Sequence, residues 1–279
     1  MFRDLGRATP ARGFRRTIPR DQGTRRRLPP HPGRLATTGR HSSDPRPISS
    51  TPALPTVLQI VYLIFNEAHT ATRGSRLHRA DLADEAIRLA RQLHHRLPNH
   101  SETAGLLALL LLTDARRSAR IDSDGELVPL DRQDRQLWNK SVITEGLTLL
   151  TAAFRHHQLG DYQLQAAIAA VHTQAGTFDG TNWTEIQALY NLLARRNPNP
   201  LIDLNRAVAV AHTDGPERAL QDLAPLAQRL ADHHRYHATI GYIHALRGDP
   251  DAARHAYAIA TQLATNEPAR RYLQRKATL

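Results

Sequence analysis

The chain has 279 residues, of which 41% are hydrophobic and none is cysteine, and its formal net charge is +11. The length suffices for one large domain or two modest ones, and the lack of cysteine excludes a disulfide scaffold, a thiolate metal site and a cysteine nucleophile. The longest apolar stretches, residues 53–65 and 106–112, are shorter than the roughly 20 residues that cross a bilayer, so we expect a cytoplasmic protein without membrane contact.

The first 50 residues hold most of the excess positive charge. They contain 12 arginines, no lysine and three aspartates, together with seven of the 17 prolines. Because no helical or strand periodicity accompanies this composition, residues 1–52 are predicted to be a disordered tail. Three interpretations stay open: an arm that binds phosphates, a mitochondrial presequence whose helix the prolines would oppose, and non-native sequence from a misplaced start or a wrong reading frame.

From residue 51 onward the pattern is helical almost throughout, which predicts an all-α protein. Residues 81–97 place apolar side chains on one face at helical spacing, and Pro98 ends that helix. Ser101 is expected to cap the next helix. Apolar residues lie on all sides of that helix, so we predict that it is buried at the centre of its domain.

One segment departs from the helical pattern. In residues 121–130 an Asp124-Gly125 pair stands between apolar residues, which predicts a tight turn or a short hairpin. Helical spacing of apolar residues then returns over residues 162–175.

The C-terminal third has the residue spacing of a tetratricopeptide repeat. Small residues there allow two antiparallel helices to approach closely, a glycine makes the turn, and a tyrosine fills the space between them. The positions are Gly241, Gly248, Ala253, Tyr257 and Ala260, with Ala207 and Ala219 in a copy 34 residues earlier. With a weaker copy that includes Trp183 and Tyr190, about three hairpins are expected to stack.

Two polar residues, Asn66 and Glu67, directly follow an apolar helical stretch. Polar groups beside a core need hydrogen-bond partners. One hypothesis is that they contact a partner or the neighbouring charged segments and so hold the domain in one orientation. The alternative is that they form a cap at the end of the helix and are satisfied by nearby backbone groups.

A second candidate contact site combines charge with an aromatic residue. Its members are Asp114, Arg116, Arg117, Asp131, Asp134, Arg135 and Trp138. Since arginine and tryptophan contribute much of the binding energy at interfaces, a partner site is one hypothesis. The other is an internal ion-pair network that pins the hairpin onto the helices.

No motif indicates catalysis. Residues 122–126 resemble the start of a calcium loop, but the later ligands are missing. Three nearby histidines, His233, His234 and His237, lack an accompanying zinc motif and are interpreted as surface residues. Neither a nucleophile motif nor a glycine-rich phosphate loop is present. We therefore predict no enzymatic activity, no metal, no cofactor and no small-molecule substrate.

Four blocks of the sequence, LIFNEAHTA, LLALLLLTDARRSARIDSDGELVPLDRQDRQLWNKSVITEGL, GDYQLQAAIAAVHTQA and LNRAVAVA, point to a known family. Together they resemble the C-terminal extension of bacterial extracytoplasmic-function RNA polymerase sigma factors, which is tetratricopeptide-like. The similarity covers residues 54–276 in the family's order. Two departures are Ala68-His69, where the family usually has Gly-Tyr, and Asn139-Lys140, where it tends to Asp-Arg.

The resemblance implies a helical domain over residues 53–176 and tetratricopeptide-like hairpins over residues 177–279. It also implies a regulatory, protein-binding role in transcription initiation, with RNA polymerase core or sigma domains as partners. In the family two sigma domains precede this extension, and residues 1–50 are too short and too rich in proline to form them. We therefore expect the chain to lack the sigma domains and to be unable to read promoter DNA alone.

Two alternative functions stay open. The first alternative is a free-standing helical-repeat scaffold that binds another protein, with the arginine-rich tail as an electrostatic arm. The second alternative is a small-molecule-binding helical domain, or even an enzyme, that uses Asn66 and Glu67 in a pocket.

Overall fold

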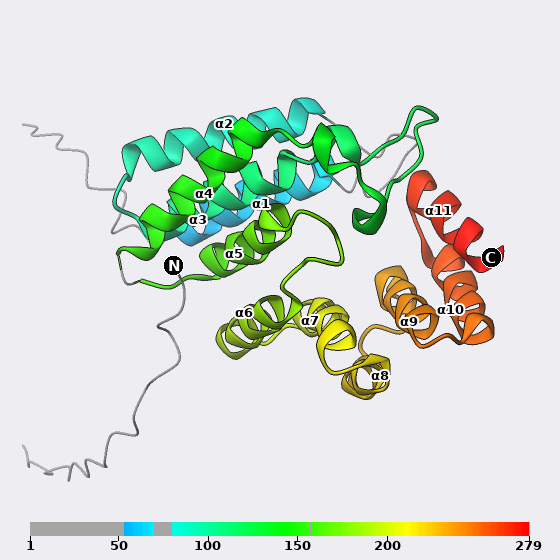
Figure 1. Cartoon of the computed structure of the whole chain (residues 1–279). Coiled ribbons are helices and arrows are strands. Elements are labelled where there is room, and N and C mark those ends of the chain that lie inside the picture. The colour runs from blue at the N-terminus through cyan, green and yellow to red at the C-terminus, as the bar shows by residue number, and fades with distance from the viewer. Residues whose placement is uncertain (1–52, 70–79, 157, 279) are drawn as a thin grey trace, which may run out of the picture. The chain divides into compact units, whose positions relative to one another are not determined.

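The computed structural model describes residues 53–69, 80–156 and 158–278. Over these residues the chain forms α-helices, short 3₁₀ turns and one isolated β-bridge, which confirms the predicted all-α fold (Figure 1). The predicted disordered tail, residues 1–52, lies outside the described residues. None of the helices in the described ranges is both long enough and apolar enough to cross a membrane.

The first five helices pack around α3. Their bounds are α1 Leu54–His69, α2 Ala80–Arg96, α3 Ser101–Asp114, α4 Lys140–Phe154 and α5 Asp161–Gln174. Helix α3 contacts each of the other four, and Figure 1 shows it among them. Of its first twelve residues only Glu102 is not buried. This is the central burial that the apolar residues on all sides of the helix predict.

The start of α3 differs from the prediction. The N-cap is His100 rather than Ser101, because the Nδ1 atom of His100 accepts a hydrogen bond of 3.3 Å from the backbone N–H of Thr103. Ser101 is already the first residue of the helix and is buried. An imidazole nitrogen thus satisfies a free N–H group that a serine hydroxyl more often satisfies. The prediction, which relied on the preference for serine as an N-cap, was therefore wrong by one residue.

The segment between α3 and α4 forms the predicted tight turn. Ile121 and Leu127 make an antiparallel bridge, and Gly125 at the tip has a φ of 75°, which favours glycine. The rest of the segment consists of short 3₁₀ turns: η2 Arg117–Ala119, η3 Leu130–Arg132 and η4 Arg135–Leu137.

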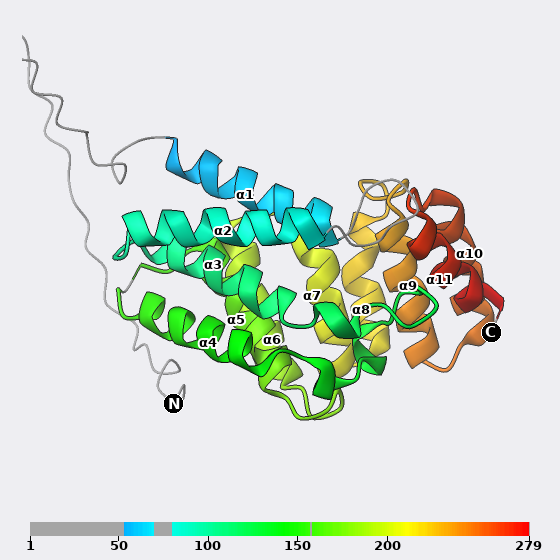
Figure 2. The ribbon, with the colours of Figure 1, turned by 90° about the horizontal axis from the view of Figure 1, so that it is seen from above.

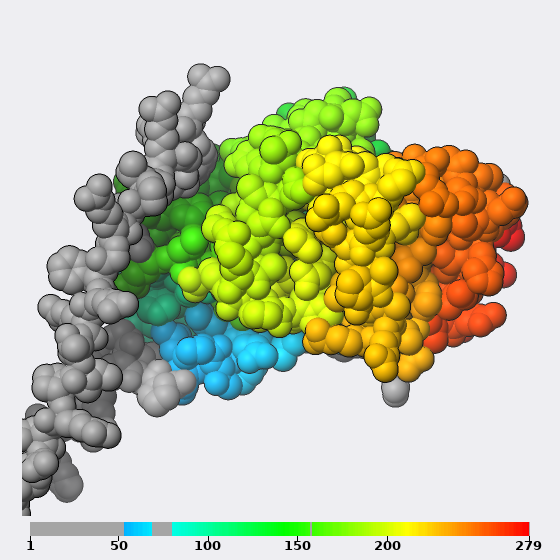
Figure 3. Space-filling model, turned by 90° about the horizontal axis from the view of Figure 1, so that it is seen from below, coloured from blue at the N-terminus to red at the C-terminus, as the bar shows by residue number. Residues whose placement is uncertain are grey.

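Six further helices follow one another in chain order (Figure 2). Their bounds are α6 Trp183–Arg196, α7 Pro200–Thr213, α8 Pro216–Leu223, α9 His234–Leu246, α10 Pro250–Leu263 and α11 Glu267–Thr278. Each packs against the next, and α7 also contacts α9. The view from below shows α6 to α10 as adjacent bands from lime to orange (Figure 3). Neighbouring hairpins therefore share a continuous surface.

The predicted repeat residues lie where helices meet. A Cβ atom on Gly241 in α9 would lie 3.0 Å from the ring of Tyr257 in α10, so the two helices approach closely. Gly248, with a φ of 78°, makes the turn between them. Ala253 and Ala260 are buried in the same contact. In the earlier copy Ala207 and Ala219 are buried in the corresponding way. The division into two domains near residue 176 stays a prediction, since α5 packs against both α3 and α6.

Candidate partner-binding groove

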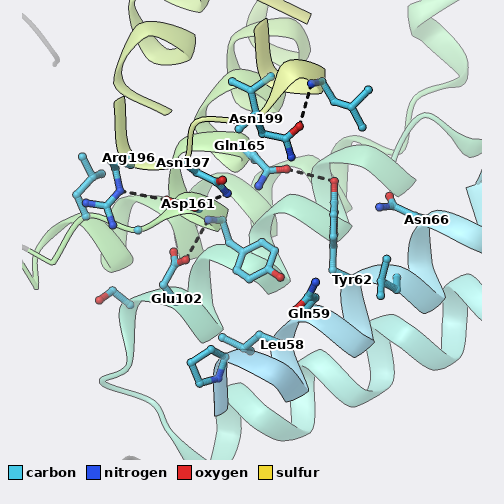
Figure 4. A pocket seen from close by; sticks show the side chains of 18 of the residues that line it. Leu58, Gln59, Tyr62, Asn66, Glu102, Asp161, Gln165, Arg196, Asn197 and Asn199 are labelled. Atoms are coloured by element: carbon cyan, nitrogen blue, oxygen red, sulfur yellow. Dashed lines mark hydrogen bonds and ion pairs between the residues drawn. The ribbon is translucent and has the colours of Figure 1, made fainter. Parts of the chain in front are cut away.

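A cleft of about 1250 Å³ separates α1 from the start of α5 and from the segment that joins α6 to α7. Figure 4 shows the side chains of α1 on one side of this cleft and those of α5 and the α6–α7 segment on the other. The view from below places α1, in blue, beside the lime surface of α6 and α7 (Figure 3). The cleft therefore has one wall from α1 and an opposite wall from α5 and the segment that joins α6 to α7.

The orientation of α1 follows from its apolar pattern. Leu54, Leu58, Val61 and Phe65 recur at helical spacing and are buried, and α1 contacts α2 and α3. This burial leaves Gln59, Tyr62 and Asn66 to line the cleft. The hydroxyl of Tyr62 donates a hydrogen bond of 3.2 Å to Oε1 of Gln165 in α5, and so ties the two walls together.

The base of the cleft is built at the start of α5. Glu102 of α3 accepts hydrogen bonds from the backbone N–H groups of Tyr162, at 3.0 Å, and Gln163, at 3.1 Å. These are free N–H groups in the first turn of α5, and a carboxylate is favoured there. Burial nevertheless raises the pKa of Glu102, because desolvation outweighs the two hydrogen bonds. Nearby, Asp161 accepts hydrogen bonds of 3.1 Å from both Arg196 and Asn197.

Amide side chains are the most frequent polar groups in the cleft. They are Gln59, Asn66, Gln158, Gln165, Asn197, Asn199 and Asn205. An amide both donates and accepts hydrogen bonds without carrying charge, which matches the peptide groups of a polypeptide backbone. Such a lining can form hydrogen bonds with an extended chain.

A second cavity of about 380 Å³ lies among the hairpins. Its lining is largely aromatic: Phe178, Trp183, Tyr190, Tyr242, Tyr257 and Tyr272. Trp183 stacks on His212 with ring centroids 4.1 Å apart, and Nε2 of His212 lies 2.8 Å from the hydroxyl of Tyr242. The positions of these two aromatic side chains are therefore fixed by packing and by a hydrogen bond.

The two cavities meet at Asn205 and Arg235, which line both. Arg235 donates a hydrogen bond of 3.4 Å from Nη2 to Oδ1 of Asn205, so α7 and α9 are joined at this point. We call the two cavities together the groove, with an amide end at α1 and an aromatic end at α9 to α11. Its size and its mixed lining are typical of a ligand or peptide site.

Of the nine predicted contact residues, Asn66 and Asp131 line the groove. Asn66 lies in the last turns of α1, within the helix, while its neighbour Glu67 is exposed. Asp131 lies on η3, across the aromatic end from α9 to α11. Asn66 and Asp131 are thus the predicted contact residues whose side chains line one of these two cavities.

The other predicted contact residues make internal contacts. Arg117 pairs with Asp114 at 2.8 Å and with Asp84 of α2 at 2.6 Å. Asp134 accepts a hydrogen bond from the N–H of Gln136 and so caps η4. These contacts agree with the internal-network hypothesis. Partner binding by the exposed parts of the cluster stays a prediction.

Arg135 anchors the wall formed by η3 and η4. Its Nη1 atom donates to the carbonyl oxygens of His172, at 2.7 Å, and Ala175, at 2.8 Å, at the C-terminal end of α5. A cation is favoured at this end of a helix. Its guanidinium also lies 4.4 Å from the ring centroid of Trp138, which is buried.

Burial, with the nearby charges of Arg120 and Arg135, lowers the pKa of Arg116 to about 10.

The sequence did not single out Asn199, Asn205, Arg235, Tyr242 and Tyr272. The sequence did contain a signal for the tyrosines. Tyr242, Tyr257 and Tyr272 are spaced 15 residues apart, which is close to the number of residues from a position in one helix of a hairpin to the equivalent position in the next helix. No comparable spacing marks the amides, whose convergence depends on how α1 packs against the hairpins.

The histidines considered as possible zinc ligands make other contacts. His233 and His234 stack with ring centroids 5.5 Å apart, and Nε2 of His237 lies 2.7 Å from the carbonyl oxygen of Ala231. Within the described residues there is no group of three His, Cys, Asp or Glu side chains arranged to hold a metal ion.

Comparison with known proteins identifies relatives but no function. Residues 53–154 match the model of a family of unknown function (DUF6596), a range that includes α1 to α4. An uncharacterized protein of Rhizobium meliloti (strain 1021) is 42% identical over 241 residues, which are 86% of this chain and 57% of that protein. The chain therefore spans little more than half the length of this relative. No solved structure matches the chain.

Proposed function

We propose that the chain is the regulatory, protein-binding extension of an extracytoplasmic-function sigma factor and acts in transcription initiation in the cytoplasm. Its groove would hold a polypeptide segment of the sigma domains or of RNA polymerase core, and promoter DNA would be contacted only through the sigma domains. The assignment to this family is supported by the resemblance of the four sequence blocks. The groove supplies the means of binding.

One observation supports a polypeptide ligand above others: the amide end and the aromatic end share Asn205 and Arg235 in their linings, so one segment could reach both. Amides can bond successive peptide groups, and an aromatic cavity can take a side chain from the same segment. Stacked helical hairpins commonly bind extended segments in this way. A compact small molecule would use one end only.

The length of the Rhizobium meliloti relative also supports the proposal. About two-fifths of that protein lies outside the aligned region, which leaves room for further domains such as two sigma domains. In such a protein the sigma domains would be tethered to the groove, and tethering raises their effective concentration at the site.

The test uses the full-length relative, bacterial RNA polymerase core and a promoter template in a run-off transcription assay. We expect transcription that depends on the relative, and we expect the present chain, added in excess, to change the yield several-fold by competing for the tethered segment. The variant Asn205→Ala combined with Tyr62→Ala should lose this effect, while Arg88→Ala, on the exposed side of α2, should retain it.

The possible outcomes separate the parts of the proposal. If the relative does not support transcription from any promoter tested, the sigma-factor role is wrong. If it does, but the added chain has no effect, the groove does not bind the sigma domains or core. A free-standing scaffold or a small-molecule-binding domain would then be the better description.

A further inference from the structure

The aromatic end of the groove brings together three phenol rings and one carboxylate. Tyr242, Tyr257 and Tyr272 come from the successive helices α9, α10 and α11, and Asp131 faces them from η3. We infer that this end of the groove receives a basic side chain, arginine or lysine, from the bound polypeptide. The inference rests on the proposed function for the polypeptide, but the chemistry of the cavity can be tested without it.

The tyrosines are held in position by packing. The ring of Tyr257 lies against Gly241, where a Cβ atom would be only 3.0 Å away, and its side chain is 5% exposed. The hydroxyl of Tyr242 is 2.8 Å from Nε2 of His212. Ring faces and phenol oxygens that are fixed before binding attract a cation without further loss of side-chain entropy.

Asp131 is held opposite these rings by the segment that precedes α4. Glu126, on the adjacent turn, pairs with Arg271 at 2.9 Å and with Arg275 at 2.6 Å, and so fastens this segment to α11. Gln133 donates a hydrogen bond of 3.1 Å from Nε2 to the carbonyl oxygen of Val128 and closes the turn on the other side. Asp131 is exposed and makes no ion pair with another described residue.

The electrostatics agree with this geometry. Burial, followed by the charges of Asp131 and Tyr272, raises the pKa of Tyr242 to about 12. The pKa of Tyr257 is also raised, first by burial and then by Tyr272, Tyr242 and Asp131. Near neutral pH the phenols are therefore uncharged, and the carboxylate of Asp131, with the ring faces and phenol oxygens, can stabilise a cation placed among them.

Other charged groups near the cavity set the direction in which the side chain enters. Glu126 pairs with both Arg271 and Arg275 and so offsets one of these two positive charges, while the ammonium of Lys276 lies 6.0 Å from the ring centroid of Tyr272. Burial and Asp131 raise the pKa of Tyr272, and Arg132 and Arg275 oppose this rise. Arg235 also lines the cavity, beside Asn205. Within the lining, Arg235 therefore repels a basic head group and Asp131 attracts it.

An aromatic or aliphatic side chain is the competing occupant, since most of the lining is apolar. Such a group would cover the carboxylate of Asp131 without supplying a hydrogen bond or a charge, and burying a carboxylate unpaired is costly. A guanidinium or ammonium provides the missing charge and places its alkyl stem against the rings. The observed lining therefore favours a basic residue.

The experiment measures binding of capped amino acids to the full chain by saturation-transfer NMR and by tyrosine fluorescence. The probes are N-acetyl-arginine methylamide, its uncharged analogue N-acetyl-citrulline methylamide, and N-acetyl-tyrosine methylamide. We expect the arginine probe to bind about tenfold more tightly than the citrulline probe, as a cation–π contact and an ion pair require. Because the result is a ratio, competition from the arginines of residues 1–50 lowers both affinities alike.

Two variants locate the effect. Asp131→Asn should lower the affinity for the arginine probe about tenfold and leave the citrulline probe unchanged. Tyr272→Leu should weaken the arginine probe severalfold. The matched control is Asp124→Asn, an exposed aspartate on the nearby turn, which should change neither affinity.

Three results would overturn the inference: equal affinities for arginine and citrulline, stronger binding of the tyrosine probe, or an arginine preference that survives Asp131→Asn. None of these results affects the transcription assay, so the inference and the proposed function can fail separately.

Discussion

The two groups of helices, α1 to α5 and α6 to α11, are packed with different side chains. In the first group the centre is α3, where Leu106, Leu110 and Leu112 are fully buried. In the second group small residues lie at the helix contacts, among them Gly241 and Ala260, and tyrosines fill the space between helices. The first group is therefore stabilised by the volume of its core, and the second by close approach of its helices.

This difference explains where the aromatic end of the groove can form. A leucine-rich centre leaves no free inner surface, whereas short contacts between successive hairpins leave one side of each helix to line a cavity. The aromatic end of the groove is made by the second group together with η3. The two groups should therefore respond differently to mutation.

The largest effect is expected from truncating the centre of the first group. Leu110 is fully buried in α3, so Leu110→Ala should lower the free energy of unfolding by about 4 kcal/mol through lost apolar burial and a cavity. Urea denaturation followed by circular dichroism measures it. Leu63→Ala, on the exposed side of α1, is the matched control and should change stability by less than about 0.5 kcal/mol. Equal losses in both variants would contradict the central role of α3.

The next largest effect is a loss of stability at acid pH, caused by a histidine in α5, the helix that contacts both groups. Burial, followed by the charges of Arg116, Arg135 and His212, lowers the pKa of His172 in α5 to about 4. Because the unfolded state, with a pKa near 6.5, then binds more protons, stability should fall as the pH drops from about 6.5 to 4, by about 3 kcal/mol.

The variant His172→Phe separates this histidine from the others. Nδ1 of His172 is buried without a hydrogen-bond partner among the described residues, so phenylalanine should be tolerated at neutral pH. Its loss of stability between pH 6.5 and 4 should be smaller than that of the parent chain, measured by thermal unfolding at each pH. The exposed His156→Gln is the control. Parallel pH profiles for parent and His172→Phe would show that His172 does not contribute.

Enlarging a small residue tests the second group. Ala260 of α10 is fully buried beside Tyr257, and Ala260→Leu should destabilise the chain by about 2 kcal/mol through overpacking. The same enlargement at Ala258, which is exposed on α10, should be close to neutral, and urea denaturation compares the two. A stable Ala260→Leu variant would mean that α9 and α10 have room between them.

Much of the fold could be predicted from the sequence because its signals are local. The apolar residues of α3 predicted central burial, and the spacing from Gly241 to Ala260 predicted a close helix pair with its turn at Gly248. The predicted N-cap of α3 was wrong by one residue, because His100 accepts the hydrogen bond that a serine hydroxyl usually accepts at this position. Histidine is not among the residues that are strongly preferred as N-caps, so nothing in the sequence indicated it.

The groove could be predicted only in part. Asn66 was selected because it follows an apolar helical stretch, and Asp131 because it belongs to a charged segment with an aromatic residue; both line the groove. Asn205 and Arg235 occupy polar positions of amphipathic helices and do not stand out in the sequence. Only the packing of α7 beside α9 brings them together. Contacts between residues far apart in sequence depend on tertiary packing, which a helical period does not encode.

The smallest effect is expected where the first group meets the second. Glu126 pairs with Arg271 and Arg275 of α11, whose side chains are about half exposed, so Glu126→Gln should cost only about 1 kcal/mol. The loss should shrink as salt is added, because salt screens exposed charges. Thermal unfolding in low and high salt, with Asp124→Asn as the control on the same turn, measures both effects. A loss that does not depend on salt would mean that glutamine disturbs the turn itself, and Asp131 would then be positioned by the turn rather than by α11.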